Sequence, residues 1–523
     1  MSATEGTRAV LGIDIGTTST KAVLVGADAV VRASGQAGYP LDAPRPGWAE
    51  QDPRAVLDAV VEAVREAVAD RPADEVAGLA LSSAMHSLLG LDGAGEPVTP
   101  VITWADGRAS EQADRLRADP LGPALHRRTG TPVHPMSPLV KLPWLLQHDP
   151  AGVAGVRCWA GIKEYVLAQL TGDLVVDHGI ASATGLFSLA DRTWDDEALA
   201  YAGVRADQLP PPVPTRHTLR LSRAGAETLG LPEGLPVVVG SGDGPLANLG
   251  VGAVRPGSAA CSIGTSGAVR VATDAPHVDP RGRVFCYVLD GDRYVVGGAV
   301  NNGGNVLDWV GEALAPEVAE QATVGGHSVP EALVSLAEEA PPGSGGLLFL
   351  PYLHGERAPL WSSLPQGVYL GLRREHRREH LVRAALEGVC LQLALVVASL
   401  EEAGARVLEI RATGGFSRSP LWRQILAGAL GRPIGFAATP EGSSLGAALL
   451  GLTTLDLLED LDRAADLVAV EDVEEPDPGL TACLAPLVAL ADRAVDALLP
   501  TFADLRDAQA ALPATDPADA RSA

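Results

Sequence analysis

One short stretch near the N-terminus, residues 10–21, constrains the fold more than any other part of the chain. An apolar run leads directly into Asp14, and this pattern predicts a buried strand that ends in a carboxylate. A polar turn that contains Gly16 follows, and the apolar residues 22–25 then predict a second strand. The sequence therefore predicts a hairpin with a tight polar tip.

The tip of this hairpin has the composition of a phosphate-binding turn. Gly16 lets a ligand approach the backbone closely, and the hydroxyl groups beside it are hydrogen-bond donors. Backbone N–H groups in such a turn can hold a phosphate, and Asp14 can hold Mg²⁺ through its waters. An ordinary β-hairpin with a hydroxyl-rich turn is the alternative interpretation. The residues expected to contact phosphate are Gly16, Thr17, Thr18, Ser19 and Lys21.

A second copy of this pattern favours phosphate binding. Residues 259–271 repeat the order of strand, Ile-Gly-Thr turn and strand, with Gly264, Thr265 and Ser266 at the turn. Two phosphate hairpins that face each other imply a duplicated α/β fold with ATP between its halves. This arrangement resembles the actin, hexokinase and sugar-kinase superfamily. The expected fold class is therefore α/β, with two duplicated ribonuclease H-like domains and ATP and a sugar in the cleft between them.

The composition limits the kinds of molecule that this protein is expected to bind. The net charge of −25 argues against nucleic acid and against anionic membrane surfaces. No apolar run is long enough to span a bilayer, and the N-terminus carries no targeting signal. The five cysteines are scattered without the paired spacing of a metal site, which suits a reducing compartment. We therefore expect a cytoplasmic monomer or homodimer that acts on a small molecule.

Two segments at predicted strand ends have the composition of a sugar site. Met85 and His86 follow a strand predicted over residues 76–82, and ligands collect at such strand ends. Trp104, Asp106 and Arg108 follow a second short strand. An aromatic ring packs on the C–H faces of a polyol, while charged groups bond its hydroxyls. A structural histidine and an ordinary ion pair at a helix N-terminus are the alternatives.

Two further segments carry a specific resemblance. In residues 136–146, Pro138, Lys141 and Trp144 match the first signature of the FGGY carbohydrate kinases. Residues 367–387 match the second signature, and the resemblance extends from about residue 9 to residue 453. Lysine occurs only at Lys21, Lys141 and Lys163, all within these motifs or close to them.

The resemblance assigns the chemistry. It implies an ATP-dependent sugar kinase in which Asp243, at the end of a predicted strand, is the catalytic base and also contacts the sugar. It implies that Mg²⁺ is placed by Asp14 and Asp243. Apart from the resemblance, an aspartate between glycines is commonly a turn former. The resemblance also places three further residues beside the nucleotide: Gly304, Gly415 and Ser419.

The same resemblance suggests the domain boundaries. Residues 1–250 are expected to form the N-terminal, sugar-binding domain, and residues 251–455 the nucleotide-binding domain. Residues 456–523 are expected to contain an acidic linker at 471–477, a helix over 480–505 that packs back on the body, and a disordered tail.

The substrate prediction rests on the sugar segments. Their sequences are most similar to those of gluconokinases, with xylulokinases as the close alternative. A substrate carboxylate would then need a cation, and Arg108 or His134 is expected to supply it. Two other classes of protein compete with a kinase: a sugar-binding regulatory module without catalysis, and an actin-like filament protein. Retention of Asp14 and Asp243 disfavours the first, and both kinase signatures disfavour the second.

Overall fold

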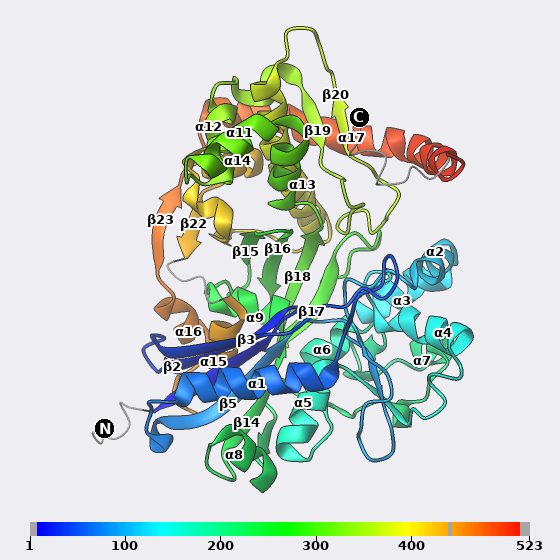
Figure 1. Cartoon of the computed structure of the whole chain (residues 1–523), viewed down its shortest axis with the longest axis vertical. Coiled ribbons are helices and arrows are strands. Elements are labelled where there is room, and N and C mark those ends of the chain that lie inside the picture. The colour runs from blue at the N-terminus through cyan, green and yellow to red at the C-terminus, as the bar shows by residue number, and fades with distance from the viewer. Residues whose placement is uncertain (1–7, 438–441, 513–523) are drawn as a thin grey trace.

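The computed structural model describes residues 8–437 and 442–512 of the chain and contains two large sheets, one in each half (Figure 1). The first sheet has β1, β5 and β14 in parallel at its centre and antiparallel strands at both edges. Its strands, in spatial order, are β13 (Thr218–Arg220), β14 (Pro236–Gly242), β5 (Val76–Ser83), β1 (Ala9–Ile15), β2 (Ser19–Gly26) and β3 (Val31–Gly38).

The second sheet repeats the central part of the first. An antiparallel hairpin, β15–β16, lies beside the parallel strand β21, as the hairpin β1–β2 lies beside β5. This duplicated α/β arrangement is the predicted fold class. The strands of the second sheet, in spatial order, are β17 (Phe285–Asp290), β18 (Arg293–Val300), β16 (Gly267–Thr273), β15 (Ser258–Ile263), β21 (Glu409–Thr413), β22 (Ile434–Ala437) and β23 (Val470–Glu474).

Helices cover the first sheet and build a lobe beside it. Helix α1 begins after Asp52, whose carboxylate accepts a hydrogen bond from the Arg54 N–H, and buries Val56, Val60 and Val64 against the strands. The helices of this half are α1 (Pro53–Val68), α2 (Ser110–Ala118), α3 (Leu121–Thr129), α4 (Pro138–His148), α5 (Ile162–Thr171), α6 (His178–Ala183), α7 (Asp196–Ala202), α8 (Arg223–Leu229) and α9 (Asp243–Gly250).

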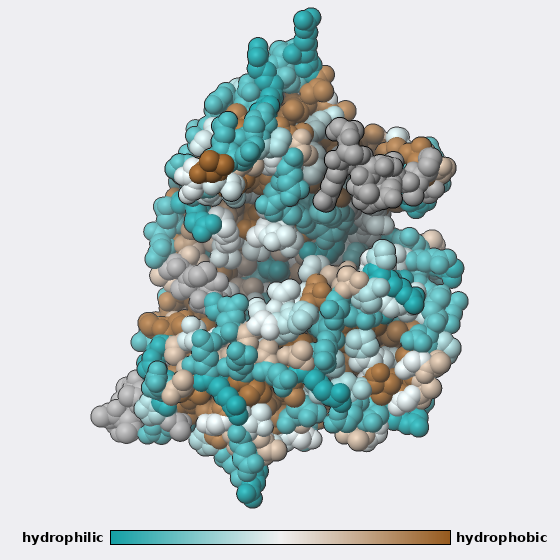
Figure 2. Space-filling model, in the orientation of Figure 1, coloured by the Kyte–Doolittle hydropathy of each residue, from teal (hydrophilic) through white to brown (hydrophobic). Residues whose placement is uncertain are grey.

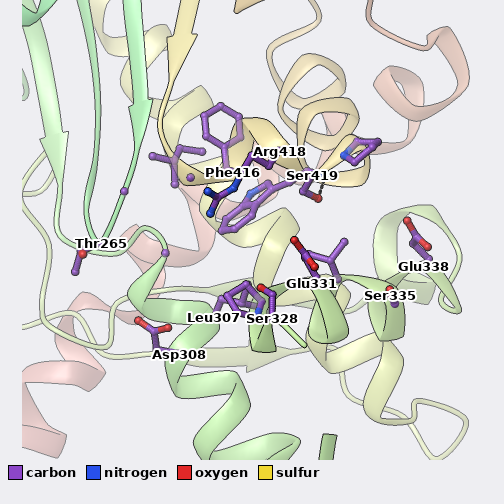
Figure 3. Close-up of a pocket in the computed structure, with 18 residues that line it drawn as sticks. Thr265, Leu307, Asp308, Ser328, Glu331, Ser335, Glu338, Phe416, Arg418 and Ser419 are labelled. Carbon is purple, nitrogen blue, oxygen red and sulfur yellow. Dashed lines mark hydrogen bonds between the residues drawn. The ribbon is translucent and has the colours of Figure 1, made fainter. Parts of the chain in front are cut away.

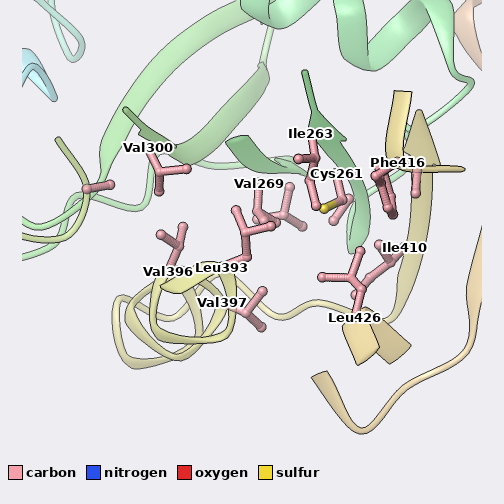
Figure 4. Close-up of a cluster of buried hydrophobic side chains, with 14 of the residues drawn as sticks. Cys261, Ile263, Val269, Val300, Leu393, Val396, Val397, Ile410, Phe416 and Leu426 are labelled. Atoms are coloured by element: carbon pink, nitrogen blue, oxygen red, sulfur yellow. The ribbon is translucent and has the colours of Figure 1, made fainter. Parts of the chain in front are cut away.

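Helix α13 (Arg378–Glu402) forms the core of the second half. Figure 4 shows its residues Leu393, Val396 and Val397 facing the second sheet, where Cys261 and Val269 lie. Among the residues that the structure describes, this helix alone is long and apolar enough to cross a membrane. However, 89% of its most apolar window is buried inside the protein, so it serves here as a core helix. The neighbouring helices are α10 (Asn305–Trp309), α11 (Pro316–Val324), α12 (Val329–Glu338) and α14 (Pro420–Leu430).

Helix α15 (Gly442–Thr454) crosses back and packs on α9 and on β1, β2 and β5 of the first sheet. Small residues allow this close approach. A Cβ at Gly446 would lie 1.9 Å from the Leu246 carbonyl oxygen, and a Cβ at Gly12 would lie 2.1 Å from that of Ser444. A helix from the second half of the chain therefore covers the first sheet.

The C-terminal region corrects one prediction. Residues 471–477 were expected to form a solvated acidic linker, but residues up to Glu474 belong to β23, which pairs with β22 at the sheet edge. An exposed edge strand tolerates charged side chains, and Arg423 neutralises two of them by pairing with Asp472 and Glu474. Helix α16 (Leu461–Leu467) precedes this strand.

The last helix follows the prediction. Helix α17 (Pro478–Ala510) packs on α13 and α14, so the helix expected over residues 480–505 does return to the body. The tail predicted beyond residue 512 lies outside the described residues. Short paired strands complete the fold: β4 (Glu50–Gln51), β6 (Leu89–Leu91), β7 (Val101–Ile102), β8 (Cys158–Ala160), β9 (Val176–Asp177), β10 (Phe187–Ser188), β11 (Thr193–Trp194), β12 (Pro212–Val213), β19 (Leu348–Leu350) and β20 (Val368–Leu370).

Candidate active site

A cavity of about 210 Å³ lies between the two halves and is lined by side chains from both. Figure 2 shows the surface hollowed between the upper and lower parts of the molecule. The cavity brings together several residues predicted from separate parts of the sequence. Its lining includes Thr17, Met85, His86, Trp104 and Asp243 from the first half, and Ser262, Ser266, Arg270, Tyr287, Arg357 and Trp361 from the second.

Asp243 lies where β14 ends and α9 begins, on the wall of this cavity. One carboxylate oxygen accepts a hydrogen bond of 2.7 Å from the Gly244 N–H. Burial raises the pKa of Asp243, while the charge of Arg270 acts to lower it. A backbone hydrogen bond from Met85 also acts to lower its pKa. No side chain of the described residues donates a hydrogen bond to this carboxylate, so it can accept a proton from a bound hydroxyl.

Asp14 lies near the end of β1 and is electrostatically coupled to Asp243. The Ser82 hydroxyl donates a hydrogen bond of 2.7 Å to its carboxylate. Burial raises the pKa of Asp14 to about 7, and the nearby charge of Asp243 adds to the rise. Two carboxylates that disfavour each other's ionisation form a site where a divalent cation can neutralise both. Within the described ranges, no group of three or more His, Cys, Asp or Glu side chains could hold a metal. The two carboxylates of Asp14 and Asp243 are a donor set that suits Mg²⁺, which is typically bound by one or two carboxylates, water and substrate phosphates.

The tip of the first hairpin is held in a fixed conformation. The Gly16 N–H donates a hydrogen bond of 3.0 Å to the Ser19 carbonyl, and the Tyr39 hydroxyl donates one of 2.7 Å to the Gly16 carbonyl. The Trp104 indole N–H donates a hydrogen bond of 2.9 Å to the Thr17 hydroxyl. Because Thr17 and Trp104 both line the cavity, this bond joins the hairpin to the predicted sugar segment.

The second hairpin has a similar closure and a further support. The Gly264 N–H donates a hydrogen bond of 2.8 Å to the Ser266 carbonyl, and the Gly304 N–H donates one of 2.6 Å to the Gly264 carbonyl. A Cβ at Gly304 would lie 2.7 Å from the same carbonyl oxygen, so this position requires glycine. The structure thus brings Gly304 against the hairpin, as the predicted phosphate contact requires.

A second cavity, of about 380 Å³, lies on the other side of this hairpin. Figure 3 shows Thr265 and Asp308 at one end, with Phe416, Arg418 and Ser419 across the cavity from Leu307, Ser328 and Glu331. Its volume and its mixed apolar and polar walls suit a nucleoside. It gathers five residues predicted to contact the nucleotide: Gly264, Thr265, Gly304, Gly415 and Ser419.

Two residues predicted to bind sugar lie elsewhere. The Arg108 guanidinium donates hydrogen bonds to Asp106 and Glu50 and stacks 3.7 Å above the ring of Trp48. Its side chain is only 4% exposed, and neither Arg108 nor Asp106 lines the cavity. Asp106 in turn accepts a hydrogen bond of 2.7 Å from the Ala49 N–H. Both residues therefore fix the loop that carries Trp104, and Arg108 has no free donor edge on the cavity.

Lys141 has a similar supporting position. Its buried ammonium group donates to three backbone carbonyls: those of His86 at 2.8 Å, Ile102 at 3.3 Å and Thr103 at 2.7 Å. Burial lowers the pKa of Lys141 to about 7. Lys141, the lysine of the first signature, thus connects the loop of His86 to the loop of Trp104. A compact ammonium group suits this position because it donates to three carbonyls that surround it.

His86 is oriented as a neutral ligand. Its Nδ1 lies 2.7 Å from the Ala183 carbonyl oxygen, so Nδ1–H is the donor and Nε2 is left as an acceptor. Burial lowers the pKa of His86 to about 3, and the charge of Lys141 adds to this effect. His86 can accept a hydrogen bond from a sugar hydroxyl, but it carries no positive charge near neutral pH.

Sequence reasoning missed several lining residues, among them Arg270, Tyr287 and Arg357. Tyr287 has a buried hydroxyl with no hydrogen-bond partner among the described residues. Arg270 could have been noticed, because it interrupts the apolar run 267–273 that follows the second hairpin. Tyr287 carries no comparable signal, since its side chain reaches the cavity only through the packing of β17 against the first half.

Together these features define a class of protein. Each half supplies a hairpin with a tight glycine turn, Asp243 lines a polar cavity between the halves, and a larger, nucleoside-sized cavity lies beside the second hairpin. Sequence profiles agree with this class. The N-terminal domain of the FGGY family of carbohydrate kinases matches residues 9–250, and its C-terminal domain matches residues 259–455. The chain belongs to the FGGY family of carbohydrate kinases, whose members transfer phosphate from ATP.

Individual relatives are close over nearly their whole length. A gluconokinase of Bacillus subtilis (strain 168) is 41% identical over 461 residues, which are 88% of this chain and 90% of the relative. A xylulose kinase of Escherichia coli (strain K12) is 29% identical and covers 94% of this chain and 100% of its own. Among solved structures, a gluconate kinase from Lactobacillus acidophilus superposes with a TM-score of 0.90 at 34% identity, covering 95% of this chain and 99% of its own.

Proposed function

We propose that this kinase transfers the γ-phosphate of ATP to a hydroxyl of D-gluconate, giving 6-phosphogluconate. The observation that carries the proposal is the place of Asp243, in a sugar-sized cavity that the second hairpin separates from a nucleoside-sized one. The choice of gluconate is supported by the greater similarity to a gluconokinase than to xylulose kinases. D-Xylulose, phosphorylated to xylulose 5-phosphate, is the second candidate, because a xylulose kinase from Lactobacillus acidophilus also superposes with a TM-score of 0.90.

The proposed reaction is a direct displacement at phosphorus. The sugar hydroxyl gives its proton to Asp243 as its oxygen bonds to the γ-phosphorus, and the bond to the bridging oxygen breaks to release ADP. Charge develops on the phosphoryl oxygens, and the backbone N–H groups and hydroxyls of the two hairpins are placed to stabilise it. Mg²⁺, held by Asp14 and Asp243, would supply further positive charge to the phosphates. Closure of the two halves would exclude water as a competing acceptor.

The sugar contacts belong to the same proposal. Trp104 offers an aromatic face, His86 a neutral acceptor at Nε2 and Tyr287 a free hydroxyl, and all three line the cavity. Asp106 and Arg108 act indirectly, by holding the loop of Trp104. We further propose a cytoplasmic enzyme that acts as a monomer or homodimer; the net charge of −25 supports a role away from anionic surfaces.

The experiment is an assay of ADP release with a panel of gluconate, xylulose, ribulose, fuculose and glycerol. The proposal predicts the highest kcat/KM with gluconate. A higher value with xylulose would replace the proposed substrate, and an absence of sugar-dependent ADP release would remove the kinase assignment.

A further inference from the structure

An acid sugar raises an electrostatic problem that a neutral sugar does not. This inference rests on the proposed function. Gluconate would bring a carboxylate into a cavity that is lined by Asp243, whose charge also acts on Asp14. The nucleotide adds further negative charge, and the protein as a whole carries −25. Binding therefore requires a cation within the cavity that is not already neutralised.

Most cations near the cavity are already engaged or uncharged. Arg108 is paired with Asp106 and Glu50, and Lys141 is enclosed by three backbone carbonyls. Burial lowers the pKa of His134 well below its usual value, so this earlier candidate is neutral. These observations remove Arg108 and His134 as the groups that bind a substrate carboxylate.

Arg270 is different. Its side chain is half-buried on the wall of the cavity, yet it donates no hydrogen bond and forms no ion pair with the residues that the structure describes. Small neighbours make room for it: a Cβ at Gly297 would lie 2.9 Å from Arg270 Cγ, and one at Gly244 would lie 3.3 Å from its Nε. The charge of Asp243 acts on Arg270 without a hydrogen bond between the two, so the donors of this half-buried guanidinium are available to an anion in the cavity.

Arg357 adds a second positive charge at the same place. Its Nε donates to Asn301 Oδ1 at 2.8 Å and its Nη2 to the Val300 carbonyl at 3.1 Å, while its guanidinium stacks 4.9 Å from the ring of Trp104. Burial lowers the pKa of Arg357 to about 10, and the charge of Arg270 is among the causes. Two arginines that repel each other in one cavity favour an anion between them.

Arg270 lies on the sugar side of the site, away from the tip of the second hairpin. Arg270 pairs with Ala260 across the second hairpin, whereas Gly267 at the tip pairs with Ile263. Three residues along a strand correspond to about 10 Å, so Arg270 lies well back from the turn where phosphates bind. The electrostatic effects agree with this position. The charges of Arg270 and Arg357 act to lower the pKa of Asp243, whereas the charge of Lys21 acts to lower the pKa of Asp14.

We infer that the Arg270 guanidinium binds the carboxylate of the acid sugar, with Arg357 as a supporting charge, and that Arg270 selects acid sugars over neutral ones. Arginine suits this role because its planar fork can donate two parallel hydrogen bonds to one carboxylate. The contact needs no rearrangement of Arg357, whose Nε and Nη2 keep their partners.

The test compares gluconate with D-glucitol, which has a hydroxymethyl group in place of the carboxylate. In Arg270→Gln, the kcat/KM for gluconate should fall about 10- to 100-fold, as expected for loss of a charge-assisted hydrogen bond. The kcat/KM for glucitol, or its inhibition constant if it is not turned over, should change less than about threefold. Arg270→Lys should recover part of the gluconate activity. Arg220→Gln, the same change on the exposed edge strand β13, is the matched control and should leave both values unchanged.

Two results would overturn the inference. Equal losses on gluconate and glucitol would show that Arg270 acts through Asp243, and a main effect on the KM for ATP would place its anion on the nucleotide. Either result would leave the kinase assignment intact. A wild-type enzyme that does not phosphorylate gluconate would instead remove the proposed substrate and the carboxylate contact together. Thermal unfolding of each variant separates these effects from loss of the fold.

Discussion

The two hairpins share a backbone plan but differ in where they carry charge. In the first, Asp14 pairs with Lys21 directly below the turn, whereas the equivalent pair in the second is Ser262 and Ala268. Further from the turn the difference is reversed, because Val23 of the first hairpin corresponds to Arg270 of the second. The first turn is also one residue longer, since Ile15 pairs with Thr20 but Ile263 pairs with Gly267.

This comparison separates what duplication supplies from what each copy adds. A tight glycine turn beside a parallel strand is common to both copies, and it gives both halves N–H groups for phosphate. The strand positions below the turn have diverged: the first copy provides the acidic side of the site, and the second provides the cationic side. The backbone therefore explains why both halves carry a proposed phosphate turn, and the side chains explain why the charges on the two hairpins differ.

The largest expected effect is a loss of kcat when Asp243, the proposed catalytic base between the two hairpins, is replaced. Asp243→Asn keeps the size of the side chain but cannot accept a proton, so kcat should fall about 10²- to 10⁴-fold. Gluconate binding, measured by calorimetry, should change little. Asp207→Asn, an exposed carboxylate outside both cavities, is the control. A variant that turns over at nearly the wild-type rate would show that the two hairpins do not flank this base.

A smaller effect on the Mg²⁺ requirement is expected when Asp14 of the first hairpin is replaced by serine, the residue at the equivalent position of the second hairpin. Asp14→Ser removes one carboxylate of the proposed Mg²⁺ site, and the Mg²⁺ concentration for half-maximal activity should rise about 10- to 100-fold. The reciprocal change, Ser262→Asp, should not lower this concentration, because Ser262 lines the cavity from the second half of the chain, whereas Asp14 belongs to the first sheet. A Mg²⁺ titration of both variants checks the prediction. An unchanged requirement in Asp14→Ser would contradict the acidic role of the first hairpin.

The two turn glycines should respond differently to alanine. A Cβ at Gly16 would lie 2.9 Å from the Ser19 carbonyl, whereas at Gly264 the nearest atom is 4.0 Å away. Gly16→Ala should therefore lower the free energy of unfolding by about 1–3 kcal/mol. Gly264→Ala should leave stability almost unchanged and raise the KM for ATP about tenfold, or about 1.4 kcal/mol. Denaturant titration and initial rates test both; similar destabilisation in the two variants would contradict the geometry.

The last prediction concerns the pH dependence of stability, measured as a slope per pH unit. The pKa of Asp14 is raised to about 7 in the folded protein, chiefly by burial, and is near 4 when the chain is unfolded. Between these values only the folded state holds this proton, so stability falls as pH rises, by up to about 1.4 kcal/mol per unit. Asp14→Asn removes this contribution and should flatten the slope between pH 4 and 7 in the absence of Mg²⁺. Parallel slopes would show that Asp14 titrates normally.

Local patterns allowed much of this site to be predicted. The hairpins, the strand that ends at Asp243 and the glycines beside the nucleotide cavity each have a signal within ten residues of sequence. Arg108 was misplaced because a sequence does not show that Glu50 and Asp106 would engage it first. The contributions of Tyr287 and Arg357 could not be predicted, because they depend on packing between the halves.

The C-terminal region also could not be predicted from local sequence alone. The acidic residues at 471–477 suggested a segment exposed to solvent, but residues up to Glu474 pair with the edge strand β22. Backbone hydrogen bonds to an edge strand do not depend on the charge of side chains that face the solvent. The helix α17 was predictable because its apolar residues recur with helical spacing. The domain boundaries expected at residues 250 and 455 stay a prediction, and α15 shows that the chain crosses between the halves within them.

The central claim is that one phosphoryl group passes between the two hairpins to a sugar hydroxyl held by Asp243. A crystal structure of Asp243→Asn with Mg²⁺, ATP and gluconate tests it most directly. The account predicts the γ-phosphate between Thr17 and Thr265, the 6-hydroxyl about 3 Å from residue 243 and the carboxylate on Arg270. A γ-phosphate that contacts only one hairpin, or a gluconate with no hydroxyl within reach of residue 243, would contradict it.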